Sequence, residues 1–271
     1  MKNFLYMNGE LIEKDLPLRS IFYGEGLFET FRWNKTAPVF LDKHLERMKQ
    51  GAELLKIPFP GKSKLKKRVE KAIEKSDLED AYAKLCLLSS SPAKFYSEAN
   101  EESVLVMTRK YKKPNKRMKV CIASTKRHSS SPSLYIKSIN YLENVLTRRK
   151  SINQGYEDAI FLNEREEVSE STSANLFWVK EDTLYTPAVE CGLLPGITRE
   201  ALISLAPNLG FEVEEGNFKL DEVYNSEGIF LTNALMGIAE VTEIEEKKVS
   251  SNEKLFKKLR KSLFEKLGWT S

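Results

Sequence analysis

A stretch in the middle of the chain, residues 135–142, places a lysine among apolar side chains in an alternating pattern. If the stretch is an extended strand, Tyr135, Lys137 and Ile139 lie on one side of it, because successive side chains point to opposite faces. An ammonium group beside apolar neighbours is poorly solvated, which lowers its pKa and frees the amine to react with an aldehyde. Taken alone, the stretch is explained more simply by a lysine at a strand end whose head reaches water.

Three motifs follow this lysine in order. Residues 168–177 place Glu170 ahead of a turn of small residues and an apolar strand, Thr186-Pro187 comes next, and residues 194–199 lead into a helix. Together with Lys137 these motifs resemble the class IV aminotransferases, the fold type IV enzymes that use pyridoxal 5'-phosphate (PLP). The resemblance covers most of the chain. It implies an α+β, two-domain fold, with a small N-terminal α/β domain and a larger, barrel-like, mixed α/β domain at the C-terminus.

The length and composition of the chain exclude several classes of protein. With 271 residues, 41% of them hydrophobic, the chain can form one large or two smaller folded domains. The formal net charge of +4 is spread along the chain; it mildly favours anionic ligands and does not by itself indicate nucleic acid. No apolar run approaches the length of a membrane span, and the first residues lack the apolar core of a signal peptide.

The cysteines and histidines indicate neither disulfides nor a metal. Cys86, Cys121 and Cys191 are isolated and odd in number, which suits a reducing compartment, so we expect a cytoplasmic protein. His44 and His128 are the only histidines and lie in separate segments, with no carboxylates arranged around them by the sequence. We therefore expect no metal site.

The order of the expected elements indicates two units. A hairpin is expected over residues 4–12, because Asn8-Gly9 suits a type I′ turn, and Asp42 is expected to cap a helix. Strands are expected at 24–33, 39–41, 82–88, 104–109, 117–123, 158–163, 176–180, near 211 and at 229–231. Helices are expected from 42, over 64–74 and 143–153, from 198, and over 252–267. We expect an N-terminal α+β domain over 1–123, a serine-rich connector over 124–134 and a PLP-binding domain over 135–271.

The resemblance implies a role for each part of a PLP site. It assigns Lys137 to the covalent bond with the cofactor and, once released, to proton transfer as general base. It assigns Glu170 to the pyridine nitrogen, where an anion keeps that nitrogen protonated. It assigns Arg47, together with the helix start at Ile197 and Thr198, to the phosphate, since a helix N-terminus presents free N–H groups to an anion.

Other residues of the implied site distinguish the members of the family. Tyr141 is assigned to the ring oxygen of the cofactor, although packing would explain this tyrosine as well. Asn233 and Ala234 are also expected to bind the cofactor. They lie in a stretch, 231–238, that resembles the aminodeoxychorismate lyases more than the aminotransferases, as does the stretch 24–30. That second stretch contains Phe28, where D-amino-acid enzymes have a tyrosine.

Two positions depart from the lyase pattern. Many of those enzymes have an arginine in a glycine-rich loop where this chain reads Ser89-Ser90-Ser91-Pro92-Ala93-Lys94-Phe95-Tyr96. We expect Lys94 to replace that arginine as the cation for the substrate, and Phe28 to contact the substrate as well. A lysine cannot hold a carboxylate in the same bidentate way. In addition, Glu240 stands where a proline is usual before Val241.

Three functions are therefore open. The first is a PLP-dependent 4-amino-4-deoxychorismate lyase, and the second is a branched-chain or D-amino-acid aminotransferase. The third, a basic protein that binds nucleic acid, is disfavoured because the helical lysines are interleaved with acids and no aromatic run for base stacking accompanies them. The resemblance also implies a homodimer, a small-molecule carboxylate substrate, and no nucleic-acid or membrane partner.

Overall fold

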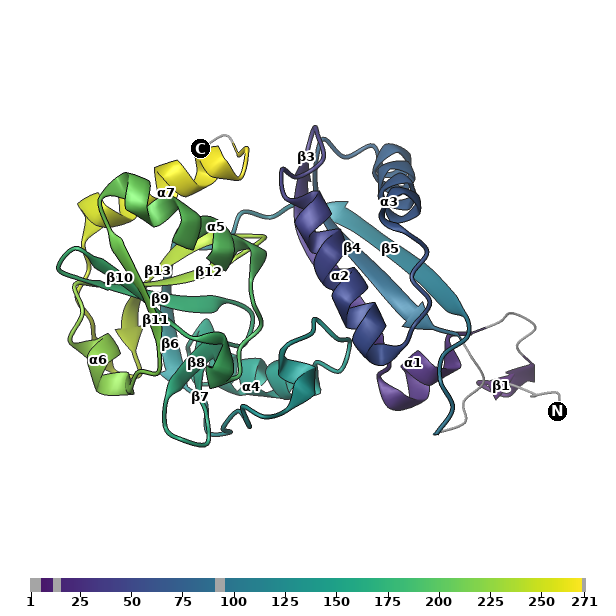
Figure 1. Cartoon of the computed structure of the whole chain (residues 1–271), viewed down its shortest axis with the longest axis horizontal. Helices are drawn as coiled ribbons and strands as arrows, with labels where there is room; N and C mark the ends of the chain where they lie inside the picture. Colours follow the sequence, from purple (N-terminus) through teal and green to yellow (C-terminus); the bar gives the residue numbers. More distant parts are fainter. Residues whose placement is uncertain (1–5, 12–15, 91–95, 270–271) are drawn as a thin grey trace.

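The structure is a computed structural model and describes residues 6–11, 16–90 and 96–269. Figure 1 shows two units side by side, each built on its own β-sheet. A short hairpin of β1 (Tyr6–Met7) and β2 (Glu10–Leu11) precedes them. Asn8 and Gly9 turn this hairpin with φ angles of 54° and 87°, so the predicted type I′ geometry is confirmed.

The N-terminal unit is an antiparallel sheet covered on one face by two helices. Its strands pair in chain order, and residues of α2 and α3 share one apolar core with every second residue of β3 and β4. That alternation arises because successive strand residues point to opposite faces of the sheet. The elements are α1 (Leu18–Tyr23), β3 (Gly26–Asn34), α2 (Leu41–Leu55), α3 (Lys62–Ser76), β4 (Asp80–Ser89) and β5 (Glu102–Lys110).

The C-terminal unit is a mixed sheet that closes into a barrel. In the described part of the chain, the ring runs β9, β12, β13, β6, β7 and β8, and β8 pairs back to β9. β10 and β11 continue the sheet outward from β9, and β14 pairs with β13. The strands are β6 (Arg117–Ile122), β7 (Asp158–Leu162), β8 (Val168–Ser171), β9 (Asn175–Lys180), β10 (Thr183–Pro187), β11 (Glu212–Gly216), β12 (Gly228–Asn233), β13 (Gly237–Ile244) and β14 (Lys247–Lys248).

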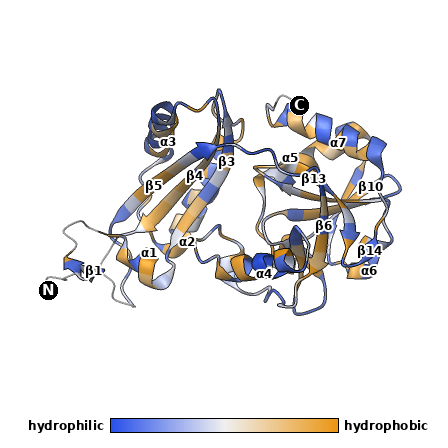
Figure 2. Cartoon of the chain, turned by 180° about the vertical axis from the view of Figure 1, so that it is seen from behind, coloured by the Kyte–Doolittle hydropathy of each residue, from blue (hydrophilic) through white to orange (hydrophobic). Residues whose placement is uncertain are grey.

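Helices cover this barrel on several sides. α5 (Ile197–Leu205) and α7 (Glu253–Lys266) pack together on the strands through an apolar cluster that includes Leu202, Phe230 and Leu259. α4 (Leu142–Asn153) and α6 (Leu220–Tyr224) complete the set of α-helices among the described residues. In Figure 2, α7 carries hydrophilic and hydrophobic residues side by side, and its apolar residues are the buried ones, as in an amphipathic helix.

The structure corrects the prediction for the central lysine stretch. Residues 135–142 do not form a strand: a 3₁₀ turn, Pro132–Leu134, precedes an irregular segment that leads into α4. The segment nevertheless lies beside the start of β3, because Phe28 N–H donates to the Lys137 carbonyl at 2.8 Å and Ile139 N–H donates to Gly26 O at 2.9 Å. A single antiparallel bridge, Leu27 to Ser138, joins the two stretches.

Three further predictions about elements are wrong. Residues 39–41 form no strand but turn directly into α2, whose N-cap is Phe40; Asp42 lies in the first turn without capping it. The strand expected at 117–123 does not complete the N-terminal antiparallel unit. As β6, it pairs in parallel with β13 and β7 inside the barrel. The division into residues 1–123, 124–134 and 135–271 remains a prediction, and the position of β6 favours a boundary between β5 and β6.

Three expectations concern membranes, metals and cysteines. Within the described residues, no helix is long and apolar enough to cross a membrane. No group of three or more histidines, cysteines or carboxylates there is placed to hold a metal ion. All three cysteines are buried as free thiols.

Candidate active site

A cavity of about 770 Å³ lies between the two units. Its walls come from β3, β4 and α2 on one side and from the irregular segment before α4, β8, the start of α5 and the end of β12 on the other. Lys94 lies outside the described residues. The other residues singled out by the sequence all line this cavity: Phe28, Arg47, Lys137, Tyr141, Glu170, Ile197, Thr198, Asn233 and Ala234.

Lys137 is half-buried in this cavity between two aromatic rings. Its Nζ lies 4.6 Å from the centre of the Phe28 ring and 5.8 Å from that of Tyr141, and the two rings meet edge-on at 5.4 Å. Burial lowers the pKa of Lys137 to about 8, and the charge of Arg47 adds to this effect. About a tenth of this amine is therefore neutral and nucleophilic at pH 7, far more than for an ordinary lysine.

Glu170 on β8 is a buried carboxylate with few partners. Asn175 Nδ2 and the Leu194 N–H each donate to its Oε2 at 3.3 Å, and Arg127 Nη2 lies 3.8 Å from its Oε1. Burial raises the pKa of Glu170 to about 7, against the charge of Arg127 and the bond from Leu194. Arg127, at 3.8 Å, does not outweigh the effect of burial, so the carboxylate would gain from a further cationic group in the cavity.

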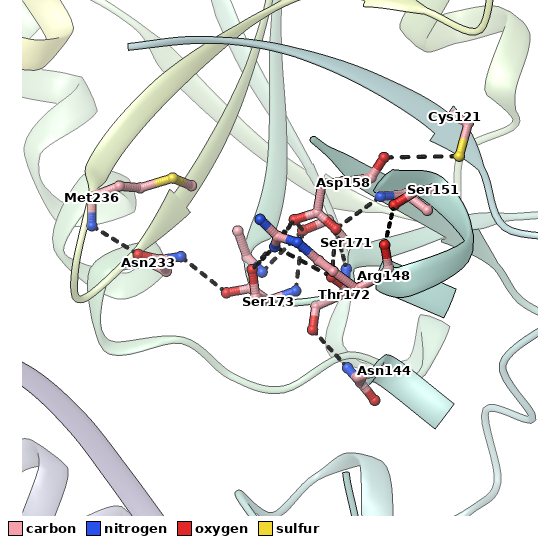
Figure 3. A network of polar contacts seen from close by, with 12 residues as sticks. Cys121, Asn144, Arg148, Ser151, Asp158, Ser171, Thr172, Ser173, Asn233 and Met236 are labelled. Atoms are coloured by element: carbon pink, nitrogen blue, oxygen red, sulfur yellow. Dashed lines mark hydrogen bonds and ion pairs between the residues drawn. The ribbon is translucent and has the colours of Figure 1, made fainter. Parts of the chain in front are cut away.

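The turn behind Glu170 is held rigidly by Asp158, as Figure 3 shows. Thr172 donates to Asp158 Oδ1 through its amide at 3.1 Å and its hydroxyl at 2.5 Å, and Ser171 Oγ donates to Oδ2 at 3.1 Å. Arg148 Nη1 approaches Asp158 Oδ2 at 2.9 Å and Ser173 Oγ at 2.8 Å. The small residues of this turn therefore use their hydroxyls to fix the end of β8.

Arg47 crosses the cleft from α2. Its Nε and Nη2 donate to Glu29 at 2.8 and 2.7 Å, and its Nη1 donates to the carbonyl of Pro195 in the other unit at 3.0 Å. Pro195 immediately precedes Gly196, the N-cap of α5. Arg47 thus brings its positive charge to the N-terminus of a helix, which is a favourable place for an anion.

The start of α5 is packed tightly against β9. A Cβ on Gly196 would lie 2.0 Å from Asn175 Oδ1, so only glycine fits at this position. Thr198 is 2% exposed and begins the helix behind Ile197. Asn175 donates to Leu194 O at 2.9 Å as well as to Glu170, so one side chain links the segment before α5 to the Glu170 carboxylate.

The loop after β12 closes the other side of the cavity. Asn233 Nδ2 donates to Ser173 O at 3.1 Å, and its Oδ1 accepts from the Leu235 and Met236 amides, so its amide group holds the loop together. Figure 3 shows Asn233 reaching from that loop to Ser173. Thr232 also lines the cavity, and its buried Oγ1 has no hydrogen-bond partner within the described structure.

The Tyr141 hydroxyl makes a hydrogen bond, so this residue does more than pack in the wall of the cavity. The hydroxyl donates to Thr172 O at 2.8 Å, and Asn144 Nδ2 donates to the same carbonyl. Burial raises the pKa of Tyr141, and the charge of Glu170 adds to the increase, so the phenol stays protonated. Its oxygen retains the capacity to accept a hydrogen bond from a group in the cavity.

Several residues of the site were not found from the sequence. Glu29, Asp158 and Asn175 acquire their roles from contacts across the fold, and no local pattern singled them out. Lys84 on β4 lines the cavity, and its Nζ lies 4.2 Å from the centre of the Phe28 ring, the ring that Lys137 also faces. The alternation of side chains along β4 could have indicated a role for Lys84 in the site, since Tyr82 and Lys84 point to the face opposite the apolar core.

These groups fit PLP, as the sequence predicted. The Lys137 amine, with its lowered pKa, can bond to an aldehyde, and the Glu170 carboxylate, with its raised pKa, suits a protonated ring nitrogen. The N-terminus of α5 together with Arg47 suits a phosphate. The unpartnered Thr232 hydroxyl is a further donor in the same cavity. The individual roles of Lys137, Glu170, Arg47, Tyr141, Ile197, Thr198, Asn233 and Ala234 stay predictions.

Comparisons with known proteins agree with this geometry. The family profile described as Amino-transferase class IV matches residues 26–244. The aminodeoxychorismate lyase of Bacillus subtilis is 29% identical over 254 residues, covering 89% of this chain and 87% of that protein. The putative branched-chain-amino-acid aminotransferase of Methanocaldococcus jannaschii is 29% identical over 282 residues, covering 94% and 93%. A solved structure of a putative 4-amino-4-deoxychorismate lyase from Legionella pneumophila is 32% identical, has a TM-score of 0.87, and covers 91% of this chain and 93% of its own.

Proposed function

Because the chain belongs to the class IV aminotransferase family of PLP-dependent enzymes, we propose that it is a 4-amino-4-deoxychorismate lyase. The predicted family, fold type and cofactor are confirmed by the match over residues 26–244 and by the likeness to the Legionella structure. The single observation that carries the lyase assignment is the 32% identity to that structure over nine-tenths of the chain. The B. subtilis lyase supports it independently.

The walls of the cavity suggest how the chain holds the cofactor. Lys137 is placed to bond to it, Glu170 to pair with its ring nitrogen, and Arg47 with the α5 N-terminus at Ile197 and Thr198 to bind its phosphate. When bound, PLP supplies a ring that stabilises negative charge on the amine-bearing carbon of the substrate. The hydrogen bonds from Asn175 and Leu194 hold the Glu170 carboxylate in place as the partner of that ring nitrogen.

Lys137 is also the group best placed to move a proton. Its pKa of about 8 lies close to physiological pH, so Nζ can both accept and return a proton in one catalytic cycle. The Phe28 and Tyr141 rings flank this amine and limit its access to water. We therefore assign to Lys137 the removal of the proton from the amine-bearing carbon of the substrate.

Lys84 is the cation that we assign to a carboxylate of the substrate. Among the described residues no hydrogen bond or ion pair to its Nζ is present, whereas Arg47, Arg127 and Arg148 all have acidic partners. An unpaired ammonium in a cavity is a natural anchor for an anion. Lys94, for which the sequence suggested this role, lies outside the described residues.

The proposed reaction splits the substrate into pyruvate and 4-aminobenzoate, a precursor of folate. The test is an assay of both products with purified protein, PLP and 4-amino-4-deoxychorismate, with no 2-oxoacid present. Formation of both products in equal amounts supports the lyase. A wild-type protein that binds PLP and releases neither product would show that the subfamily is wrong.

A branched-chain or D-amino-acid aminotransferase is the alternative, favoured by the 29% identity to the M. jannaschii protein over most of both chains. The two functions differ in what an amino acid alone does to the bound cofactor. A transaminase changes the absorption of the cofactor on addition of the amino acid and recovers it on addition of a 2-oxoacid. The lyase proposed here turns over its substrate without a 2-oxoacid.

We further propose a cytoplasmic homodimer that takes part in folate synthesis. Three free buried cysteines suit a reducing compartment. Large apolar side chains are exposed at Ile21 and Phe22 on α1 and at Leu142 and Leu146 on α4, which suits burial against a second copy. Light scattering at several protein concentrations tests the assembly; a monomer at all of them would contradict it.

A further inference from the structure

One buried carboxylate lies in the middle of an otherwise apolar strand face. Leu27, Phe31 and Trp33 of β3 are 1%, 1% and 7% exposed, and Glu29, on the same face beneath α2, is 0% exposed. A buried ion pair is usually no more stabilising than well-packed apolar residues of the same volume. The presence of Glu29 in this core is therefore better explained by what it holds than by stability.

Glu29 holds Arg47 by two bonds and is itself held by His44. Arg47 Nε and Nη2 donate to Oε1 and Oε2 at 2.8 and 2.7 Å, and His44 Nδ1 lies 2.7 Å from Oε2. Burial raises the pKa of Glu29, but Arg47 and His44 outweigh it and lower the pKa to about 2. Because Glu29 is then ionised and can only accept, His44 Nδ1 is the donor.

Arg47 lines the cavity and keeps donors that its bonds to Glu29 and Pro195 do not use. A guanidinium has five N–H groups, and the bonds to Glu29 and Pro195 use three of them, leaving one on each terminal nitrogen. Arg47 lines the cavity beside Ile197 and Thr198 at the α5 N-terminus. A guanidinium fixed at two atoms by one carboxylate has little freedom left, so its free N–H groups point in a set direction.

We infer that Glu29 and His44 are positioning residues: they hold the Arg47 guanidinium so that its free N–H groups meet the phosphate of PLP beside the α5 N-terminus. Neither residue touches the reacting atoms. The inference rests on the cofactor and on the phosphate role proposed for Arg47. It holds whether the enzyme is a lyase or a transaminase.

The chain offers a matched control pair. Arg32 Nε and Nη2 donate to Asp80 Oδ1 and Oδ2, both at 2.8 Å, so this pair joins β3 to β4 with the same two-bond geometry. Neither Arg32 nor Asp80 lines the cavity within the described part of the chain. Losing the charge of Asp80 therefore tests what the loss of a bidentate pair does to this unit without touching the phosphate site.

The experiment compares PLP with pyridoxal, which lacks the phosphate. Apo-protein is titrated with each compound, and the two dissociation constants are measured by absorbance for wild type, Glu29→Gln and Asp80→Asn. For Glu29→Gln we expect PLP to bind about tenfold more weakly, with pyridoxal unchanged, because the loss falls on the phosphate contact alone. Asp80→Asn should leave both constants, and hence their ratio, at the wild-type values.

Three outcomes would overturn the inference. One is a Glu29→Gln protein whose affinities for PLP and for pyridoxal fall by the same factor, which is what general damage to the fold would produce. Another is a Glu29→Gln protein with wild-type PLP affinity. The third is a wild-type protein that binds PLP no more tightly than pyridoxal, which would also remove the phosphate site; a failed lyase assay alone would leave the inference standing. If Glu29→Gln does not fold, His44→Leu should give the same selective loss in smaller measure, about threefold.

Discussion

Two buried glutamates, one in each unit, differ in the partners that the protein gives them, and this difference underlies the positioning role proposed for Glu29 and the binding role proposed for Glu170. Glu29 in the N-terminal unit receives Arg47 and His44, and its pKa falls to about 2 despite its burial. Glu170 in the barrel receives an asparagine amide and one backbone N–H at 3.3 Å, and burial raises its pKa to about 7. Both carboxylates are buried, yet the pKa of Glu29 is lowered to about 2 and that of Glu170 is raised to about 7, because Arg47 bonds directly to Glu29 at 2.7 Å whereas Arg127 lies 3.8 Å from Glu170.

The difference between the partners of Glu29 and Glu170 indicates which of the two carboxylates is suited to bind a ligand. A buried carboxylate with its own arginine is complete without any other molecule, whereas one short of positive charge is stabilised when a cation arrives. Glu170 lines the cavity, and Glu29 stands behind its wall. The protonated ring nitrogen of PLP is a cation of the required kind. The charges of both Glu29 and Glu170 also act on Lys137, whose pKa they raise against the effect of burial.

The largest expected effect comes from Lys137. Lys137→Ala should lower kcat about 10⁴-fold, because it removes both the covalent attachment of the cofactor and the proton carrier. The measurement is product formation at saturating PLP. Lys150→Ala, an exposed lysine on α4, serves as the control and should have wild-type activity. Comparable activity in both variants would remove Lys137 from the mechanism.

The next effect separates the two glutamates directly. Glu170→Gln should lower kcat about 10³-fold at saturating PLP, since a neutral amide cannot keep the ring nitrogen charged. Glu29→Gln should retain most of kcat once PLP is saturating, because its loss falls on cofactor affinity. Steady-state kinetics at several PLP concentrations check both. Equal losses of kcat in the two variants would break the comparison.

The two glutamates should also affect the pH dependence of stability with opposite signs. The low pKa of Glu29 stabilises the fold above pH 4.5, and this contribution disappears as the pH falls towards 2. The high pKa of Glu170 penalises the apo-protein, with no penalty below pH 4.5 and the full penalty above about pH 7. Each contribution amounts to about 3 kcal/mol at its full extent.

Urea unfolding of the apo-proteins between pH 3 and 8 measures these contributions. Relative to wild type, Glu29→Gln should lose stability most at neutral pH and progressively less in acid. Glu170→Gln should gain stability on wild type as the pH rises from 4.5 to 7. Parallel curves for the two variants would show that the two carboxylates are held alike.

A smaller effect is expected at the substrate cation. Lys84→Gln should raise KM for an anionic substrate about tenfold and change kcat little, because it removes a charge that binds the substrate and takes no part in the proton transfer. Initial rates over a range of substrate concentrations separate the two constants. Lys126→Gln is the control, since Lys126 also lines the cavity but is already paired with Glu166. An unchanged KM in Lys84→Gln would assign the carboxylate to another cation.

The sequence was most informative where chemistry and local pattern coincide. Lys137, Glu170 and Thr198 each belong to a short motif, and the structure brings all of them to one cavity. The fold class and most helices were also predicted, because their apolar spacing records which face is buried. Residues in this group are recognisable because their neighbours in sequence are also their neighbours in function.

The rest depended on contacts between distant segments. In the sequence Glu29 is only a charged residue within a strand, and its partners Arg47 and His44 come from α2. Asp158 likewise gains its partners only because β7 lies beside the turn after β8. The assignment of residues 117–123 to the wrong unit has the same origin, because a strand pattern does not encode which sheet receives it. The alternation at Lys137 misled because this segment joins the start of β3 by only one bridge and two hydrogen bonds, which is too little pairing to form a strand.

The most direct test of the account is to locate the cofactor on the chain. Purified protein is loaded with PLP, reduced with borohydride and digested, and the modified peptide is identified by mass spectrometry, with Glu170→Gln and Lys137→Ala treated in parallel. The account predicts one pyridoxyl-phosphate group on Lys137 in wild type and Glu170→Gln, and none in Lys137→Ala. Stoichiometric modification of a different lysine, or none in the wild type, would contradict it.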